Sequence, residues 1–261
     1  MFFISIYIQF YIYKKLLPTQ IRAIFMKKFT YLFALIAISL CFVQCEKNKI
    51  GQNGVHKGHE YVDLGLSVKW ATYNVGATTP EGFGDYFAWG EVEPKDYYFW
   101  DTYKYCDGAD ATYTKYCHDK DYGLNGFVDN KFELDPEDDA AAVNWGGKWR
   151  MPTLDEFDDL RYSCTWEWTT QNGVTGLLGT SRVVGYTDRT IFFPAAGIIL
   201  EDYTTAREEF PNGWYWSKSV GKNYDPTYAT HIFYFQKDPE QIKFSYIFPR
   251  IAGATVRAVC P

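Results

Sequence analysis

The sequence lacks the residue patterns of a zinc site. It has four histidines and six cysteines in 261 residues, and no two cysteines form a CxxC pair. Structural zinc sites are built from such pairs, with further cysteines or histidines as the remaining ligands. We therefore expect neither a metal nor any other cofactor.

Clusters of basic residues are also missing. The first 45 residues hold five basic and no acidic side chains, so the rest of the chain carries 21 basic and 32 acidic residues, a net charge of −11. Proteins that bind phosphate backbones present basic patches. Nucleic acid is therefore not an expected partner.

The apolar run near the N-terminus is short for a membrane span, which needs roughly 20 apolar residues. It covers 29–43, follows two lysines, and ends just before Cys45 and a hydrophilic stretch. This is the pattern of a signal peptide, with Cys45 where a lipoprotein signal peptidase would cut. We predict a signal over 26–44 and a lipidated Cys45, and hence an outer-membrane lipoprotein of the cell envelope, on its surface or periplasmic face.

Other interpretations of the N-terminal region stay open. Cys45 could be an ordinary apolar residue at the end of a cleaved signal or an uncleaved anchor helix. Residues 1–25 precede a complete signal that has its own Met26. They are interpreted as an extension from a mis-assigned start codon, with a second hydrophobic anchor as the alternative.

The mature chain is predicted to consist of a lipidated tether over 45–59 and one domain over 60–261. An even number of cysteines in an exported chain indicates disulfides, and four cysteines allow three pairings. We favour Cys106 with Cys117 and Cys164 with Cys260. Buried free thiols are the alternative.

Two helices have clear start signals in the sequence. Asp135, followed by a proline and further acidic residues, predicts a helix with an aspartate N-cap. Thr153 and Glu156 form a capping box at the start of a second helix, which should end near Tyr162 or Ser163.

Short strands are expected where polar and apolar residues alternate, or where a brief apolar run ends at turn residues. The segments with these patterns are 61–64, 67–71, 86–90, 191–194, 214–217, 229–235 and 254–260. Because most of them follow the two helices rather than alternate with them, the sequence predicts an α+β domain with antiparallel strands.

The stretch 91–134 has no helical or strand period and is rich in aromatic residues. A loop of this length is usually functional or internally stapled, and binding residues concentrate on such loops. We predict that it is a disulfide-stapled loop and a ligand-contact surface, although packing of the loop on its own scaffold is the competing use. The candidate ligand-binding residues are Tyr98, Trp100, Tyr103, Tyr105, Tyr113 and Tyr116.

Five motifs in order resemble the Fibrobacter succinogenes major paralogous domain, over about 60–261. They are YVDLGLSVKWA at 61–71, WRMPT at 149–153, IFFPAAG at 191–197, WYWS at 214–217 and VRAVC at 256–260. The resemblance implies an exported, often lipid-anchored protein whose fold is related to the C-type lectin-like domain and to formylglycine-generating enzymes. It also implies that Cys164 and Cys260 lie where the lectin-like fold has its long disulfide. The calcium-dependent sugar motifs of animal lectins are absent.

Acidic residues could supply oxygen ligands for calcium. For two sets of such residues, an ordinary role as a helix start or as solvated acids fits better than calcium binding. The sets are Asp135, Glu137, Asp138 and Asp139, and the loop acids Asp107, Asp110, Asp119, Asp121 and Asp129.

No catalytic residues are assigned. His118 lies between Cys117 and Asp119 in the sequence, but a cysteine nucleophile needs a reduced thiol and an oriented base. We therefore predict a non-catalytic module that binds a glycan or a protein at the cell surface. The alternatives are a structural component of the envelope and, last, an enzyme of the formylglycine-generating type or one acting on glycans.

Overall fold

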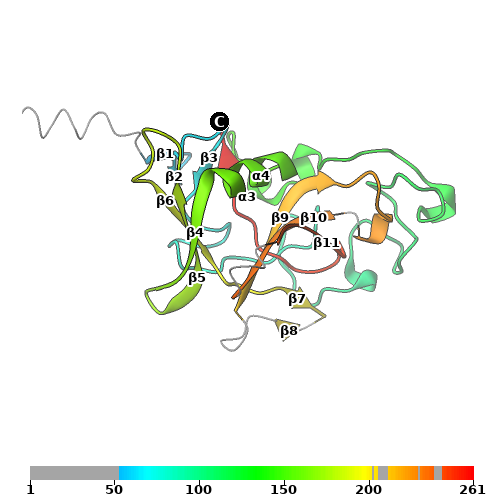
Figure 1. Ribbon diagram of the computed structural model, residues 1–261. Coiled ribbons are helices and arrows are strands. Elements are labelled where there is room, and N and C mark those ends of the chain that lie inside the picture. The colour runs from blue at the N-terminus through cyan, green and yellow to red at the C-terminus, as the bar shows by residue number, and fades with distance from the viewer. Residues whose placement is uncertain (1–52, 202, 205–210, 229, 238–242) are drawn as a thin grey trace, which may run out of the picture. The chain divides into compact units, whose positions relative to one another are not determined.

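A computed structural model describes residues 53–201, 203–204, 211–228, 230–237 and 243–261 (Figure 1). The predictions for 1–25, for the signal over 26–44 and for Cys45 fall outside these residues. Within the described ranges, no helix has the length and apolar character needed to cross a membrane.

The strands named here pair into four small sheets, and every pair is antiparallel. The first sheet has the order β1 (Gly54–His56), β2 (His59–Val62), β3 (Lys69–Ala71) and β12 (Val259–Cys260). It joins the two ends of the domain, because β12 pairs with β3. The second sheet has the order β11 (Lys243–Phe248), β10 (Thr230–Gln236) and β9 (Asn212–Val220). The third has the order β4 (Cys164–Gln171), β5 (Val174–Ser181) and β6 (Thr190–Pro194). The fourth pairs β7 (Ile199–Leu200) with β8 (Tyr203–Thr204).

Helix α4 (Leu154–Ser163) confirms the second predicted helix. The Thr153 hydroxyl accepts a hydrogen bond from the amide of Glu156, and the Glu156 carboxylate accepts one from the amide of Thr153. The buried face of the helix presents Phe157 and Leu160 to the core. The sequence signal was sufficient here because a capping box satisfies otherwise unpaired amides with local residues alone.

The first predicted helix starts later than expected. Residues after Asp135 form only the short 3-10 helix η3 (Pro136–Asp138), and helix α3 spans Ala140–Trp145. Its N-cap is Asp139, whose carboxylate accepts from the amides of residues 141 and 142. Asp135 thus occupies the N-cap position of η3 but makes no side-chain cap bond, and a second aspartate, Asp139, caps the α-helix.

Strand β9 separates two hydrophobic cores. Tyr215 packs in the core that contains Phe157 and Phe233, whereas Trp216 packs in the core that contains the loop aromatics. Consecutive residues of a strand point to opposite faces, so both faces of the β9–β10 sheet are covered. Residues 214–217 therefore face hydrophobic core on both sides of the strand.

The strand predictions hold in outline and need three corrections. Strand β1 lies within the predicted tether, so the domain begins before residue 60. Residues 86–90 make one isolated bridge, Phe87 with Ala254, rather than a strand. The last strand is only two residues long. The α+β class is consistent with the structure, while the C-type lectin-like fold stays a prediction.

All four cysteines of the domain are free thiols in the structure. Cys106 donates to the backbone carbonyl of Trp100 at 3.0 Å, and Cys117 to a carbonyl two residues later, also at 3.0 Å. Cys164 and Cys260 lie in different hydrophobic cores. The structure thus differs from both predicted pairs, and hydrogen bonds and packing hold the long loop in place of a disulfide.

Candidate functional site

The aromatic residues predicted to contact ligand are mostly core residues. Tyr98, Tyr103, Tyr105, Tyr113 and Tyr116 are each at most 6% exposed and belong to one hydrophobic core, with Trp100 half-buried against it. Burying a tyrosine ring contributes large apolar area, provided that its hydroxyl finds a partner. The structure therefore places these tyrosines in the core of the domain, and not on the ligand-contact surface that was predicted.

The loop is held to the start of helix α3 by a buried carboxylate. Asp138 is 3% exposed. It accepts hydrogen bonds from the Tyr116 hydroxyl at 2.7 Å and from the ammonium of Lys115 at 2.5 Å, and it pairs with Lys104 at 3.2 Å. Burial alone would raise the pKa of Asp138, but the hydrogen bonds from Lys115 and Tyr116 outweigh it and hold that pKa well below its usual value.

Three of the acidic residues of 135–139, namely Asp135, Asp138 and Asp139, thus bond within the protein, whereas Glu137 is exposed. Asp135 pairs with Lys115 at 2.7 Å and with Lys131 at 2.5 Å. Asp139 caps helix α3 and also accepts from the Met151 amide. Within the described residues, no three or more His, Cys, Asp or Glu side chains are grouped so as to hold a metal ion.

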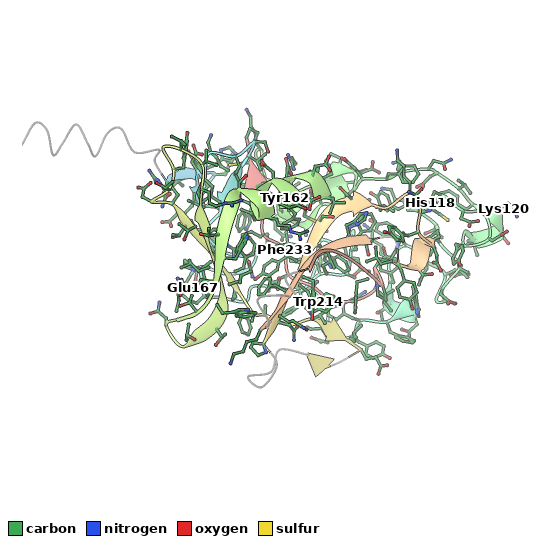
Figure 2. All side chains as sticks on the ribbon, in the orientation of Figure 1. His118, Lys120, Tyr162, Glu167, Trp214 and Phe233 are labelled. Atoms are coloured by element: carbon green, nitrogen blue, oxygen red, sulfur yellow. The ribbon has the colours of Figure 1, made fainter. Side chains whose placement is uncertain are left out.

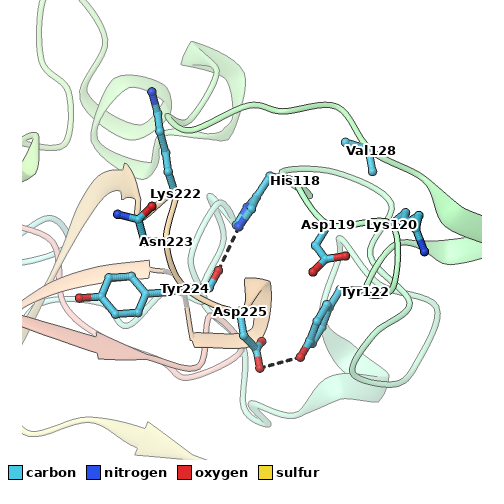
Figure 3. Close-up of a pocket in the computed structure, with 9 residues that line it drawn as sticks. All are labelled: His118, Asp119, Lys120, Tyr122, Val128, Lys222, Asn223, Tyr224 and Asp225. Carbon is cyan, nitrogen blue, oxygen red and sulfur yellow. Dashed lines mark hydrogen bonds between the residues drawn. The ribbon is translucent and has the colours of Figure 1, made fainter.

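The exposed part of the long loop forms one wall of a groove. His118 and Lys120 lie at the end of the domain away from Glu167 of strand β4 (Figure 2). The groove is open and has a volume of about 670 Å³. The second wall is the segment between β9 and the 3-10 helix η4 (Pro226–Tyr228) (Figure 3). The lining residues are His118, Asp119, Lys120, Tyr122, Val128, Lys222, Asn223, Tyr224 and Asp225.

Two hydrogen bonds connect the walls. The ring nitrogen Nε2 of His118 lies 2.9 Å from the carbonyl oxygen of Tyr224, and the Tyr122 hydroxyl donates to Oδ2 of Asp225 at 2.9 Å (Figure 3). A carbonyl only accepts, so His118 must carry its proton on Nε2. The Asp225 carboxylate also accepts from the Thr227 amide at 2.7 Å, which fixes it on its own wall.

Several polar groups remain directed to solvent along the groove. Lys222, Asn223 and Tyr224 are exposed, and 43% of the Tyr224 surface is accessible. Asp119 is half-buried, and its Oδ1 accepts from the Asp121 amide at 2.9 Å. The residues that line the groove therefore include an asparagine, carboxylates, lysines and an exposed tyrosine.

A cysteine–histidine pair is not assembled at this site. The Cys117 thiol donates to the backbone carbonyl of Asp119, and burial raises its pKa. The hydrogen bond of His118 goes to the other wall of the groove. His118 and Asp119 thus line the groove. Although both residues are close to Cys117 in the sequence, the structure does not show them activating its thiol.

Sequence reasoning identified only part of this groove. His118 and Asp119 are among the residues considered for chemistry in the sequence, whereas Tyr122 and the whole segment 222–225 are not. The two walls are about a hundred residues apart in the chain. For the segment 222–225, the sequence shows only a run of mostly polar residues after a predicted strand. Such runs are too common to identify a binding site.

No family model matches this chain, and no curated protein or solved structure is significantly similar to it. Membership of the Fibrobacter succinogenes major paralogous domain therefore stays a prediction from the five motifs.

Proposed function

We propose that this protein is an exported, lipid-anchored module that binds a saccharide at the groove between 118–128 and 222–225, without transforming it. The observation that carries the proposal is the groove itself, whose lining residues include Asp119, Asn223 and the exposed Tyr224. Sugars present several hydroxyl groups and an apolar ring face. Amide and carboxylate side chains can bond hydroxyl groups, and an aromatic ring packs against the apolar face.

The dimensions of the groove support a small or terminal saccharide. Its volume of about 670 Å³ is within the range of about 300–1,000 Å³ found for small-molecule sites. The hydrogen bonds from His118 and Tyr122 hold the two walls in place before a ligand arrives. Such preorganisation lowers the entropic cost of binding.

The location of the protein is part of the same proposal. A lipidated Cys45 would display the domain on the membrane, where glycans are abundant. Acyl chains contribute about 0.8 kcal/mol per buried methylene, so two or more chains give a durable anchor. Mass spectrometry of the mature N-terminus tests this directly. A lipid adduct on Cys45 is expected, and an unmodified chain that begins at another residue would contradict it.

The groove is tested with the full chain on a glycan array, followed by titration of the saccharides that bind. Loss of the stacking ring in Tyr224→Ala should weaken binding about tenfold, which corresponds to about 1.4 kcal/mol. Asn223→Ala should weaken it by a similar factor. Tyr162→Ala is the matched control, because Tyr162 is a 63% exposed tyrosine on helix α4, outside the groove.

Three outcomes decide between this proposal and the alternatives. Binding that falls in both groove variants and not in the control supports the saccharide site. Binding that is equal in all variants places the saccharide elsewhere. Absence of any bound glycan, together with a stoichiometric protein crosslink in intact cells, would favour a protein ligand or an assembly role.

A further inference from the structure

Arg250 is a fully buried cation that lies behind the groove. It follows strand β11 and has 0% exposure. Its Nη1 donates to the carbonyl of Tyr116 at 3.1 Å, and its Nη2 to the carbonyl of Pro226 at 2.6 Å. Within the described part of the chain it has no salt bridge to a carboxylate. A buried charge normally requires an ionic partner. Because Arg250 lacks one in that part of the chain, its two hydrogen bonds to backbone carbonyls are the feature that calls for a structural explanation.

The two carbonyls lie next to the two walls of the groove along the chain. Tyr116 is two residues before His118, and Pro226 directly follows Asp225. A guanidinium has several donors in a rigid plane, so one side chain can hold two backbone segments at a fixed spacing. An apolar residue of the same size could fill the volume but could not bond either carbonyl.

Aromatic rings complete the environment of this cation. The guanidinium carbon lies 4.4 Å from the centre of the Tyr113 ring and 5.4 Å from that of Trp89. Both rings are buried. Contacts of a cation with aromatic faces are attractive and grow stronger when water is excluded. These rings offset part of the cost of burial and keep the planar fork in one orientation.

We propose that Arg250 is a positioning residue of the groove: it sets the spacing between the His118 wall and the Tyr224 wall, and through that spacing the affinity for the ligand. The ligand part rests on the proposed function, whereas the mechanical part does not. Without Arg250, the side-chain hydrogen bonds that still join the walls within the described residues would be those of His118 and Tyr122, which lie at the surface and compete with water. The groove would then be wider on average and more mobile.

Arg257 is a matched control within the same molecule. It is also 0% exposed, it donates to the Ala71 carbonyl at 3.2 Å and to Asn74 at 2.8 Å, and it lies 4.6 Å from the Phe193 ring centre. None of these partners lines the groove. Arg257→Gln therefore reproduces the loss of a buried guanidinium without touching either wall.

The mechanical part is tested on the ligand-free full chain by hydrogen–deuterium exchange. In Arg250→Gln, amides that bond within or onto the two walls should exchange about tenfold faster than in the wild type, such as those of Tyr122 and of Tyr228, which bonds the Asp225 carbonyl. In Arg257→Gln, the acceleration should appear around Ala71 and Asn74. Arg250→Lys keeps the charge but loses the fork, so it should give an intermediate result, and it serves as the test if Arg250→Gln does not fold.

The outcomes separate this inference from the proposed function. The positioning role would be overturned if the amide exchange rates at both walls were unchanged in the Arg250 variants. It would also be overturned if Arg257→Gln accelerated exchange at the walls as much as Arg250→Gln does. Neither result depends on the glycan array. If the role holds, the immobilised glycan with the strongest array signal should bind Arg250→Gln about tenfold more weakly and Arg257→Gln as it binds the wild type. Equal affinity for Arg250→Gln would overturn the link to binding.

Discussion

The hydroxyl of Tyr116 donates a hydrogen bond to Oδ2 of Asp138 at 2.7 Å, and both residues are buried. This bond joins the middle of the long loop to the start of helix α3. Tyr116 also offers its backbone carbonyl to Arg250 and its amide to the carboxylate of Asp129 at 2.7 Å. One tyrosine thus connects the helix, the loop and the inner side of the groove.

Replacing Asp138 by asparagine should therefore destabilise the domain. The variant keeps the volume but removes the charge that pairs with Lys104 and Lys115. Removal of one partner from a buried ionic cluster leaves uncompensated charge, and we expect a loss of about 3 kcal/mol. Lys115 retains Asp135 as a partner, which limits the loss. The free energy of unfolding in urea measures it.

A surface pair provides the control for this change. Asp121 is 72% exposed and pairs with Lys120, which is 75% exposed. Exposed pairs contribute little to stability because water and salt screen them. Asp121→Asn should leave the unfolding midpoint where it is in the wild type. If Asp121→Asn shifted the unfolding midpoint as much as Asp138→Asn does, the loss of stability would depend on the change in net charge and not on the burial of the carboxylate.

The stability of the domain should fall at mildly acidic pH because of His231. Burial lowers the pKa of His231 below 6.5, and the charge of Asp158 offsets this only in part. Below pH 6.5 the unfolded chain therefore binds more protons than the folded one, and the free energy of unfolding rises with pH in that window. Above pH 6.5 both states are neutral at this site and the contribution is constant.

Urea unfolding at pH 5.0 and pH 7.5 checks this sign. The wild type should lose stability at the lower pH, and His231→Gln should lose less, because glutamine does not titrate. His59, whose pKa burial also lowers, would still act in the variant. An identical pH dependence in the wild type and the variant would mean that His231 titrates alike in the folded and unfolded states.

The outcome for the two predicted helices shows what local sequence can decide. The capping box of Thr153 and Glu156 is complete within four residues, so it could be identified without the fold. Asp135 and Asp139 are both acceptable caps by type. The choice between them depends on Met151, whose amide bonds the Asp139 carboxylate from another segment. A local pattern cannot contain that information.

The groove was harder to predict than the strands and helices for a related reason. The residues of 118–128 and 222–225 form a surface only because Arg250 and the core beneath bring them together. The long loop stands out in the sequence because it is rich in aromatic residues. That enrichment reflects burial, since Tyr113 and Tyr116 lie in the core and their polar neighbours are at least partly exposed. An aperiodic loop gives no pattern from which inward and outward residues can be separated.

The cysteines of the domain should be reduced and slow to react in the folded protein. Burial raises the pKa of Cys164 to about 12, and it also raises the pKa values of Cys106, Cys117 and Cys260. Only thiolates react with iodoacetamide at an appreciable rate. At pH 8 these four positions should remain unlabelled in the native protein and become labelled in urea without a reductant.

Peptide mapping by mass spectrometry measures this labelling site by site, so that cysteines outside the domain do not enter the result. Detection of a peptide pair linked through Cys106 and Cys117, or through Cys164 and Cys260, would contradict the free thiols of the structure. Rapid labelling of a single cysteine in the native protein would instead mean that its burial is incomplete in solution.

Gly213 should be intolerant of a side chain because Phe235 crosses it. The two residues are partners in the β9–β10 ladder, and a Cβ atom on Gly213 would lie 2.2 Å from the Phe235 ring. Phe235 is itself fully buried in the core shared with Tyr215. The ring cannot move away without disturbing that core, and overpacking of this kind costs about 1–3 kcal/mol. Gly213→Ala should lower the free energy of unfolding by this amount.

Gly173 is the control that separates crowding from backbone strain. It lies in the Asn172–Gly173 turn of hairpin β4–β5 with φ of +86°, and a Cβ there would meet nothing within 4 Å. Gly173→Ala should therefore cost only the strain of a left-handed residue, about 1–2 kcal/mol. The double variant Gly213→Ala with Phe235→Leu decides the cause of the larger effect. If the clash with the ring is responsible, the cost of the alanine should shrink once the ring is gone; an unchanged cost would place the loss in the strand backbone instead.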